Sequence, residues 1–347
     1  MILHRPEMNN QVQSVSFVIP CMAEPRLLQQ CLASLAAQTY PKELTEIIVV
    51  DDASPIPLKT FFEQFQEENA SFLTLHYIRN VQNAGRAVTR NRGLAKAAGD
   101  IVFFLDVDHT LAEDCLAAIV DVFAADTQAD GIISVRANTK IPADIQAKSA
   151  FIRYIASRYP AARSAGEMKR WNWNDLPPRF FSTGSIAVSR SALMQVGGFD
   201  ESFTAYGCED EDLGIRLANI GVPLKLSRHA YVYDMDDRAS LNRVCQRMTE
   251  YALTSLPRVL AKHPNYASMT TFAVFECPEG DLPLRSRIFR RALLIFLRPW
   301  LGSIIAGGLN LVNSVPAKLQ PPAFLYQTAI TSFYLRSYRH RLSQNKR

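Results

Sequence analysis

Strand and helix signals alternate along residues 1–140 of this 347-residue chain. Short apolar runs typical of buried strands are separated by helical stretches of about ten to fifteen residues. The strand signals are SVSFVIP at 14–20, TEIIVVDD at 45–52, LTLHYIR at 73–79, VFFL at 102–105 and GIISVRA at 131–137. Because consecutive parallel strands are joined by right-handed crossovers, this alternation predicts an α/β fold with a mainly parallel central sheet flanked by helices.

Local signals mark the expected ends of three helices in this half. Pro25 occupies a first-turn position before an apolar-periodic stretch, and Gly99 follows the helical run that begins near residue 87. Thr110 and Glu113 have the spacing of a capping box. We therefore expect Thr110 to cap a helix that contains residues 111–126.

The regular alternation stops after about Pro142. Beyond it the sequence predicts a strand at 185–190, a helix opened by the acidic cluster GCEDEDLGIRLANIG at 207–221, strands at 222–227 and 230–235, and a long helix at about 237–260. We divide the chain into an N-terminal extension (1–13), two halves of one α/β domain (14–140 and 141–260) and a basic, apolar helical appendage (261–347).

Two aspartates, Asp106 and Asp108, follow the apolar run at 102–105 and are expected at the carboxyl end of a strand, where ligands of open α/β sheets bind. The signature resembles haloacid-dehalogenase-type phosphatases, whose first Asp is a nucleophile, and nucleotide-sugar glycosyltransferases, whose D-x-D motif holds a metal ion on a diphosphate. Those phosphatases usually carry the motif on their first strand. Here three strand–helix units precede it, so the phosphatase hypothesis is the weaker one.

Four motifs, in the expected order, resemble those of family 2 glycosyltransferases with the GT-A fold. They are FVIPCMAE (17–24), IIVVDDASP (47–55), NAGRAVTRNRGLAKAAGDIVFFLDVDH (83–109) and STGSIAVSRSALMQVGGFDESFTAYGCEDEDLGIRL (182–217). The last contains Gly198-Phe199-Asp200 and Glu209-Asp210 and resembles the C-terminal region of galactosyltransferases. The chain departs from the pattern at Thr89, where Ala is usual, and at Tyr206, where Trp is common.

This resemblance implies a donor site for a nucleotide-sugar. The residues implied on the nucleotide side are Pro20, Glu24, Asp51, Asp52 and Asp106, and Asp108 is implied as the direct metal ligand with Asp106 beside it. Mn²⁺ or Mg²⁺ bound by hard carboxylate oxygens acts as a Lewis acid on the leaving diphosphate. The acids of the second motif are implied to recognise the uridine.

The resemblance also implies an acceptor site. Transfer needs a base that takes the proton of the acceptor hydroxyl as it attacks the anomeric carbon. Asp210 matches the family's base, and Glu209 is implied to orient the acceptor. A single displacement assisted by one base inverts the anomeric centre. The four consecutive carboxylates at 209–212 repel one another, which predicts a compensating partner or an acceptor.

The third metal ligand departs from the family pattern. Many relatives carry a His at the end of the strand after the acidic helix, whereas this chain places Asp234 there and His229 five residues earlier. Asp binds the same hard cations, so we expect Asp234 to complete the metal site, with Asp236 as the next choice. We treat His229 as structural. The alternative is that Asp108 and phosphate alone hold the ion.

Five further side chains have two open interpretations. Arg86 and Arg90 precede the metal strand and either offset diphosphate charge or are exposed helix cations. Tyr159, Trp171 and Trp173 lie in the irregular stretch before the acceptor half. Their rings either stack on sugars or form the core of a mobile lid.

The C-terminal appendage is basic and apolar. No carboxylate follows Asp281, whereas residues 285–347 are rich in Arg and Lys. This charge and apolar content favour an anionic membrane surface over nucleic acid. Arg298 and Pro299 interrupt the apolar stretch 291–312, so it predicts interfacial helices or, equally, a helical hairpin packed on the protein's own surface.

Cysteine use and the N-terminus predict the compartment. The six cysteines (Cys21, Cys31, Cys115, Cys208, Cys245 and Cys277) show no C-x-x-C pair and no His at metal spacing, so we expect reduced core residues. Residues 1–14 lack the apolar stretch of a signal peptide. Both features predict a cytoplasmic protein, and the basic C-terminal appendage predicts a peripheral position on the inner face of the cell membrane.

The sequence therefore predicts a metal-dependent, inverting glycosyltransferase. Its expected donor is a UDP-sugar and its expected acceptor a glycan or lipid-linked sugar, as in polysaccharide biosynthesis. The alternatives are a membrane-associated protein that binds nucleotide-sugars without turnover, the phosphatase, and a nucleotidyltransferase. The last needs a Gly-rich loop after the first strand, and PCMAEPRLL contains no glycine.

Overall fold

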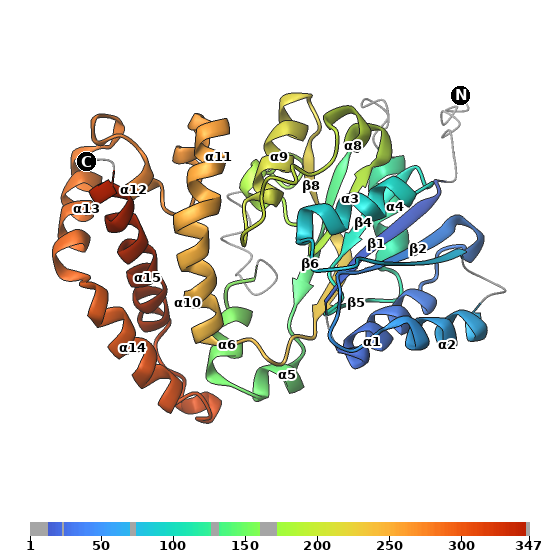
Figure 1. Cartoon of the computed structure of the whole chain (residues 1–347), viewed down its shortest axis with the longest axis horizontal. Helices are drawn as coiled ribbons and strands as arrows, with labels where there is room; N and C mark the ends of the chain where they lie inside the picture. Colours follow the sequence, from blue (N-terminus) through green and yellow to red (C-terminus); the bar gives the residue numbers. More distant parts are fainter. Residues whose placement is uncertain (1–12, 23, 70–73, 126–131, 160–171, 345–347) are drawn as a thin grey trace, which may run out of the picture.

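A computed structural model describes residues 13–22, 24–69, 74–125, 132–159 and 172–344, which form a helix-flanked sheet and a helical C-terminal lobe (Figure 1). Eight strands form one sheet in the order β3-β2-β1-β4-β7-β6-β8-β5. They are β1 (Val15–Cys21), β2 (Thr45–Asp51), β3 (Thr74–Arg79), β4 (Ile101–Leu105), β5 (His109–Leu111), β6 (Ser134–Lys140), β7 (Ser185–Ser189) and β8 (Leu224–Asp234). The predicted α/β fold with flanking helices is confirmed.

The sheet is parallel in its first half and mixed in its second. The neighbours β3, β2, β1 and β4 all pair parallel. β7 runs antiparallel to both β4 and β6, and β5 runs antiparallel to β8. The reversal at β7 brings the loop before that strand to the carboxyl end of β4, which is where the aspartate pair lies.

Two layers of helices cover the sheet, because its central strands bury both faces. Phe17 and Phe103 face the layer of α1 (Pro25–Ala36), α2 (Lys59–Asn69) and α4 (Cys115–Ala124). Val18 and Phe104 face the layer of α3 (Arg86–Lys96), α8 (Arg190–Val196) and α9 (Glu209–Asn219). Gly93 lets α3 approach β1, since a Cβ there would collide with Val18.

The prediction for Pro25 is confirmed, and two other helix-end predictions are wrong. Thr110 lies on β5, where it pairs with Tyr233, and α4 begins only at Cys115. Sheet pairing thus uses the segment that resembled a capping box. Helix α3 ends at Lys96, and Gly99 instead donates its N–H to Ser16 Oγ at 2.8 Å.

Two predictions in the second half also need correction. The two strands predicted at 222–227 and 230–235 are one strand, β8, which pairs with β6 and then with β5. The long helix begins at Leu241, where the Ser240 side chain caps α10 (Leu241–Glu250). It continues through a π-helical turn, η4 (Tyr251–Ser255), into α11 (Leu256–Lys262).

The predicted helical appendage is confirmed as a lobe on one side of the sheet domain (Figure 1). It contains α12 (Ala273–Glu276), α13 (Leu284–Phe296), α14 (Pro299–Leu311) and the long α15 (Ala323–Gln344). Helix α15 packs on α10 and α14, and Phe272 stacks on Tyr334 in the core of the lobe. The described residues between β6 and β7 include the short elements α5 (Ala143–Ala147), α6 (Ala150–Ala156) and η3 (Pro178–Phe180).

Five of the six cysteines are buried, as predicted for core residues, whereas Cys277 is partly exposed.

Candidate functional site

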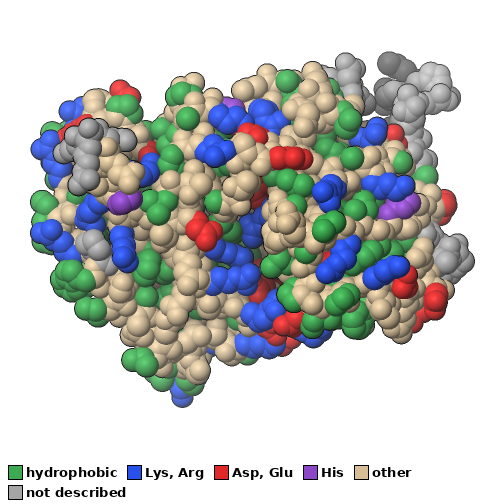
Figure 2. Space-filling view, viewed as in Figure 1, with side chains coloured by type: hydrophobic (Ala, Val, Ile, Leu, Met, Phe, Trp, Pro, Cys, Tyr) green, Lys and Arg blue, Asp and Glu red, His purple; other side chains and the backbone are tan. Residues whose placement is uncertain are grey.

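Two adjoining cavities of about 390 and 370 Å³ lie between the carboxyl ends of the central strands and α10. The residues that line both are Arg86, Arg90, Asp106, Asp108, Tyr206, Asp236, Arg243 and Arg247. Pro20 and Asp52 line only the first cavity, and Glu209, Asp210 and Asp234 line only the second. We name them the donor cavity and the acceptor cavity after the roles that the sequence predicts for these residues. Figure 2 shows basic side chains along the hollow between the C-terminal helices and the sheet domain.

The aspartate pair is held by strands from the second half of the chain. The Asp106 N–H donates to the carbonyl of Gly184 at 3.1 Å, just before β7. The Asp108 carbonyl accepts from the Met235 N–H at 2.8 Å, just after β8. The predicted position at the end of β4 is confirmed, and the antiparallel half of the sheet fixes the geometry.

The two carboxylates have opposite electrostatic environments. Burial opposes ionisation of both, but Arg90 and then His109 and Arg86 hold the pKa of Asp106 below its usual value. Burial and the nearby carboxylates Asp106, Asp234 and Asp236 raise the pKa of Asp108 to about 6, despite the favourable charge of His109. Asp108 is therefore the acid whose negative charge lacks compensation in the protein alone.

His109, directly after the pair, is a site residue that the sequence analysis missed. Its buried ring donates from Nδ1 to the Gly184 carbonyl at 2.5 Å. Although burial opposes protonation, Asp108, Asp234 and Asp106 raise the pKa of His109. A Cβ on Gly184 would lie 2.9 Å from the His109 ring, so glycine is required there. The sequence signal that could have identified His109 is its position directly after the D-x-D motif.

The acids near Asp108 offer the carboxylate oxygens that hard divalent cations prefer as ligands. Asp234 lines the same cavity and accepts at Oδ2 from the Tyr159 hydroxyl at 2.7 Å, while Asp236 also lines it. Across the described ranges, no three His, Cys, Asp or Glu side chains are already arranged as a metal shell. The carboxylate donors suit Mn²⁺ or Mg²⁺, whose other ligands are commonly water and phosphate oxygens.

Asp108→Asn is expected to stabilise the metal-free protein by about 1–3 kcal/mol at neutral pH. The folded-state pKa of Asp108, about 6, lies above its ordinary value of 3.8, so ionisation costs stability as the pH rises between them. The gain should be full above pH 6 and absent below about pH 4. Urea unfolding in EDTA at both ends of this range measures it.

The control is Asp121→Asn on the exposed side of α4, which should leave the urea midpoint unchanged. A gain from Asp108→Asn that is the same at acidic and neutral pH would show that charge is not its cause.

Arg90 connects the donor and acceptor sides of the site. Its side chain is 3% exposed and lies 3.1 Å from Glu209 Oε1, 3.2 Å from Asp106 Oδ1 and 3.7 Å from Asp210 Oδ1. These carboxylates raise the pKa of Arg90 against the effect of burial. Both predicted arginines line the two cavities, but Arg90 is paired with acids of the protein, whereas no ion pair is seen for Arg86 among the described residues.

The acidic start of α9 is confirmed, and its members have different partners. Glu209 pairs with Arg90, and its buried Oε2 has no partner among the described residues. Asp210 accepts from the Thr183 N–H at 3.2 Å and from the Thr183 hydroxyl at 2.6 Å. Asp212 pairs instead with basic side chains, namely Arg216, Lys262 and His263. Only Glu209 and Asp210 line the acceptor cavity.

Asp52 organises the wall of the donor cavity. It accepts at Oδ1 from the Ala84 N–H and the Asn80 amide, both at 2.7 Å, and at Oδ2 from the Gly85 N–H at 3.1 Å. Gly85 has φ of 86°, which favours glycine, and it precedes α3. Asp52 therefore shapes the loop before Arg86 and keeps part of Oδ2 free.

Two predicted donor residues lie outside both cavities. Asp51 is fully buried, where it accepts from Tyr77, Arg79 and the Ser54 N–H. Although burial opposes the ionisation of Asp51, these hydrogen bonds lower its pKa. Glu24 is exposed and pairs with Arg238 at 2.8 Å. Only the Arg238 side of that pair lines the donor cavity.

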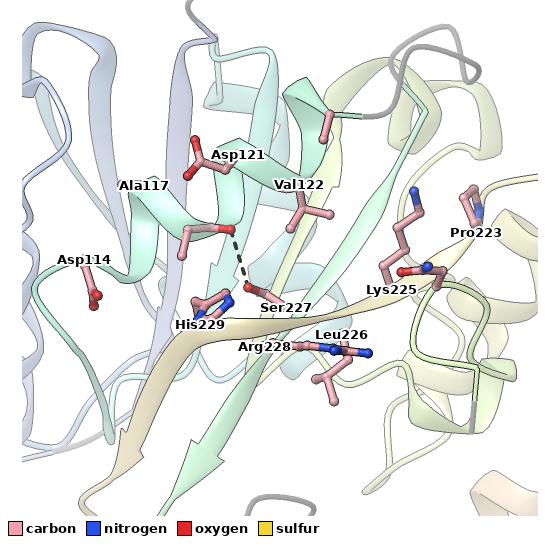
Figure 3. A pocket seen from close by; sticks show the side chains of 13 residues that line it. Asp114, Ala117, Asp121, Val122, Pro223, Lys225, Leu226, Ser227, Arg228 and His229 are labelled. Carbon is pink, nitrogen blue, oxygen red and sulfur yellow. Dashed lines mark hydrogen bonds between the residues drawn. The ribbon is translucent and has the colours of Figure 1, made fainter. Parts of the chain in front are cut away.

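His229 and Trp173 lie away from the aspartate pair. His229 lines a separate, open hollow between β8 and α4 together with Asp114 and Lys225 (Figure 3). Trp173 lies under the guanidinium of Arg228, with its ring centroid 5.6 Å away. Trp171 lies outside the described residues, so Tyr159 is the predicted aromatic residue placed at the site.

Arg243 and Arg247, both on α10, are basic site residues that the sequence analysis missed. They line both cavities, and Arg247 and Arg86 each lie 4.7 Å from the ring centroid of Tyr206. Tyr206 thus gathers two guanidiniums at one place. An anionic group such as a diphosphate fits a wall of this kind.

Comparisons with known proteins agree with this architecture. Residues 16–197 match the family model "Glycosyl transferase family 2", and residues 163–239 match "N-terminal domain of galactosyltransferase". A probable glycosyltransferase, YdaM, of Bacillus subtilis is 25% identical over 65% of this chain and 51% of its own length. Validoxylamine A glucosyltransferase of Streptomyces hygroscopicus subsp. limoneus is 24% identical over 78% and 61%. The chain thus spans about half to two-thirds of these curated relatives.

A solved structure supports the fold. The mannosyltransferase PcManGT of Pyrobaculum calidifontis, in complex with GDP-Man and Mn²⁺, aligns with a TM-score of 0.60 at 19% identity. The alignment covers 96% of this chain and 88% of that one. The fold is that of GT-A glycosyltransferases, as the motifs predicted.

Proposed function

Because the chain belongs to glycosyl transferase family 2, we propose that it is an inverting glycosyltransferase that uses a nucleoside-diphosphate sugar, with UDP as the nucleotide. The proposed acceptor is a hydroxyl of a glycan or lipid-linked sugar at the cytoplasmic face of a membrane. The observation that carries the proposal is that Asp52, Asp108 and Asp210, from three distant motifs, line two adjoining cavities. Family membership favours this function over the phosphatase hypothesis.

Asp52 supports recognition of the nucleobase. Its Oδ1 accepts two hydrogen bonds and its Oδ2 only one, so Oδ2 keeps a lone pair for a further donor. An imide N–H such as that of uracil is a suitable donor. The carboxylate thereby couples base recognition to the conformation of the loop before Arg86.

Asp210 supports the role of general base. Thr183 donates hydrogen bonds to both carboxylate oxygens of Asp210. The Asp210 side chain remains 22% exposed and lines the acceptor cavity. A carboxylate held in this way can accept the proton of an acceptor hydroxyl while that oxygen attacks the anomeric carbon. Glu209, paired with Arg90, lies beside it and is proposed to orient the acceptor.

The proposed cation ligands are Asp108, Asp106 and Asp234, with Tyr159 orienting Asp234. A bound Mn²⁺ or Mg²⁺ supplies Lewis-acid charge that neutralises the leaving diphosphate. On the protein side, Arg86, Arg243 and Arg247 add fixed positive charge at both cavities. They are proposed to hold the diphosphate oxygens by charge-assisted hydrogen bonds.

The proposal is tested by incubating UDP-sugars with the protein and Mn²⁺ and measuring UDP release and transfer. Asp108→Ala is expected to lower the rate at least about 100-fold. The control is Asp121→Ala, an exposed acid of α4, which should behave as wild type. Activity that survives in Asp108→Ala would contradict the metal assignment.

A thermal-shift screen of UDP-, GDP- and dTDP-sugars identifies the nucleotide, and UDP-sugars should give the largest shift. Calorimetric binding without product after long incubation would favour a nucleotide-sugar-binding protein instead.

A further inference from the structure

Helices α13 and α14 present a stripe of apolar side chains that no part of the described chain covers. On α13 the stripe contains Leu284, Ile288 and Ile295, and on α14 it contains Trp300, Ile304 and Leu311. Both triplets follow the spacing i, i+4, i+11, which places each on one side of its helix. Their side chains are 58–89% exposed, and Figure 2 shows hydrophobic side chains along this edge. We call these six residues the apolar stripe.

Part of each helix packs against the lobe, although Phe289 and Phe296, on another side of α13, are also 56% and 73% exposed. Ala306 and Leu309 of α14 are buried against a cluster that includes Ala329 of α15. Gly302 lies so close to Ser332 that a Cβ there would collide with it. Leu293 and Leu294 of α13 pack on the lobe core. The apolar stripe is therefore a second hydrophobic face, which the fold of the lobe does not use.

Basic side chains accompany the stripe. Arg285 lies next to Leu284, Arg298 lies at the bend between the helices, and both side chains are exposed without an acidic partner among the described residues. Lys318 is also exposed, beyond α14. No carboxylate follows Asp281 in the sequence. All the charged side chains of α13 are thus basic, although one of them, Arg291, pairs with the exposed Glu279.

We propose that the apolar stripe docks on the surface of an anionic lipid membrane, with α13 and α14 lying in the interface. Apolar side chains enter the acyl boundary while Arg side chains reach anionic headgroups. The charge argues against a second copy of this chain as the occupant, because a two-fold contact would bring Arg285 and Arg298 against like charges.

The packing also argues against a transmembrane span. No single described helix is long and apolar enough to cross a membrane. Among the described helices, only α13 and α14 taken together have the length and apolar composition of a span, and they are bent by 74° relative to each other. Helix α14 buries Ala306 and Leu309 against the lobe, and α13 packs the partly buried Leu293 and Leu294 on the lobe core. A helix that keeps one side on protein and offers the other outward suits the interface plane.

Docking would also orient the catalytic cleft. Helix α10 packs on α15, and its Arg243 and Arg247 line the cavities of the proposed site. A single helix therefore separates the membrane-facing lobe from the cleft. This inference rests on the lobe alone, so vesicle binding does not depend on the proposed enzymatic function.

Vesicle sedimentation of the full chain tests the proposal, with phosphatidylcholine alone and phosphatidylcholine mixed with phosphatidylglycerol. Wild type should bind the anionic vesicles at least about tenfold more tightly, and salt should weaken this binding. Trp300→Ser with Ile304→Ser should lower binding about tenfold or more, because it removes apolar groups from the stripe. Arg285→Glu with Arg298→Glu should lower it similarly, with most of the difference lost in high salt.

Matched controls carry the same chemical changes elsewhere. Ile56→Ser with Met194→Ser removes two exposed apolar side chains, and Lys59→Glu with Lys96→Glu makes the same change in net charge. Both should bind vesicles as wild type does, and thermal unfolding confirms that all variants are folded.

Three results would overturn the proposal. Wild type that sediments with neither kind of vesicle has no lipid-binding surface. Equal loss of binding in the controls would mean that the stripe has no special role. A concentration-dependent dimer without vesicle binding, abolished by Trp300→Ser with Ile304→Ser, would identify a second copy as the occupant.

Discussion

Replacing Asp210 with asparagine is expected to lower kcat for sugar transfer by about 10²- to 10⁴-fold, the range for loss of a general base. Asparagine cannot accept the proton of the acceptor hydroxyl at neutral pH. The dissociation constant for the nucleotide-sugar should change little, because Asp210 lines the acceptor cavity and not the donor cavity. Steady-state transfer kinetics and calorimetry of the donor measure the two quantities separately.

The fold should tolerate this change. The asparagine carbonyl can accept from the Thr183 N–H, and its amide can donate to the Thr183 hydroxyl, which replaces the two bonds now made by the carboxylate. The control is Asp212→Asn, two residues further along α9. Asp212 is buried among Lys262, His263 and Arg216 and lines neither cavity, so this variant should lose stability but keep kcat. Wild-type kcat in Asp210→Asn would assign the base to another residue.

Replacing Arg90 with methionine is expected to destabilise the protein by about 3–5 kcal/mol, the cost of removing one partner from a buried ion pair. The change removes the ion-pair partner of the buried Glu209 and the cation 3.2 Å from Asp106. Methionine keeps the apolar stem of the side chain, which isolates the effect of charge. Urea unfolding measures the loss directly.

The pH dependence gives this prediction a sign. Arg90 lowers the pKa of Asp106, so this part of its stabilisation is present above pH 3.8 and disappears as the pH falls through the folded pKa. The difference between wild type and Arg90→Met should therefore shrink on acidification. Arg90→Lys should be intermediate, because an ammonium is one point charge and cannot bridge three carboxylates as a planar fork does.

The control for Arg90 lies two residues along the same helix. Arg92 is exposed and donates to the Asn80 side chain, so Arg92→Met should cost less than about 1 kcal/mol. If the two methionine variants unfold at the same urea concentration, Arg90 is not the electrostatic link between the two halves of the site.

Local pattern predicted the strand ends and helix starts that carry the acids. The apolar run before Asp106 and the acidic run at 209–212 are properties of adjacent residues, and the structure places them at the end of β4 and the start of α9. The predictions from local pattern were wrong where the same residues could form either a helix end or a strand. Thr110 has the spacing of a cap, but pairing with β8 makes it part of β5.

Partners far apart in the chain could not be read from such patterns. Arg243 and Arg247 reach the site only because α10 packs along the cleft, and no spacing connects them to Asp108. Likewise, Asp51 and Asp52 are neighbours and both are buried, but Asp51, the last residue of β2, bonds to Tyr77 and Arg79, whereas Asp52, just after the strand, lines the cavity.

By itself, the sequence determined the α/β class, the family and the identity of the acids at the strand and helix ends, because periodicity and short motifs are local properties. Only the tertiary structure decided how charge is distributed among those acids. The antiparallel return of β7 and β8 brings Arg90, His109, Asp106, Asp210 and Asp234 together. Interactions between charges depend on distance and burial, which exist only once these strands are paired.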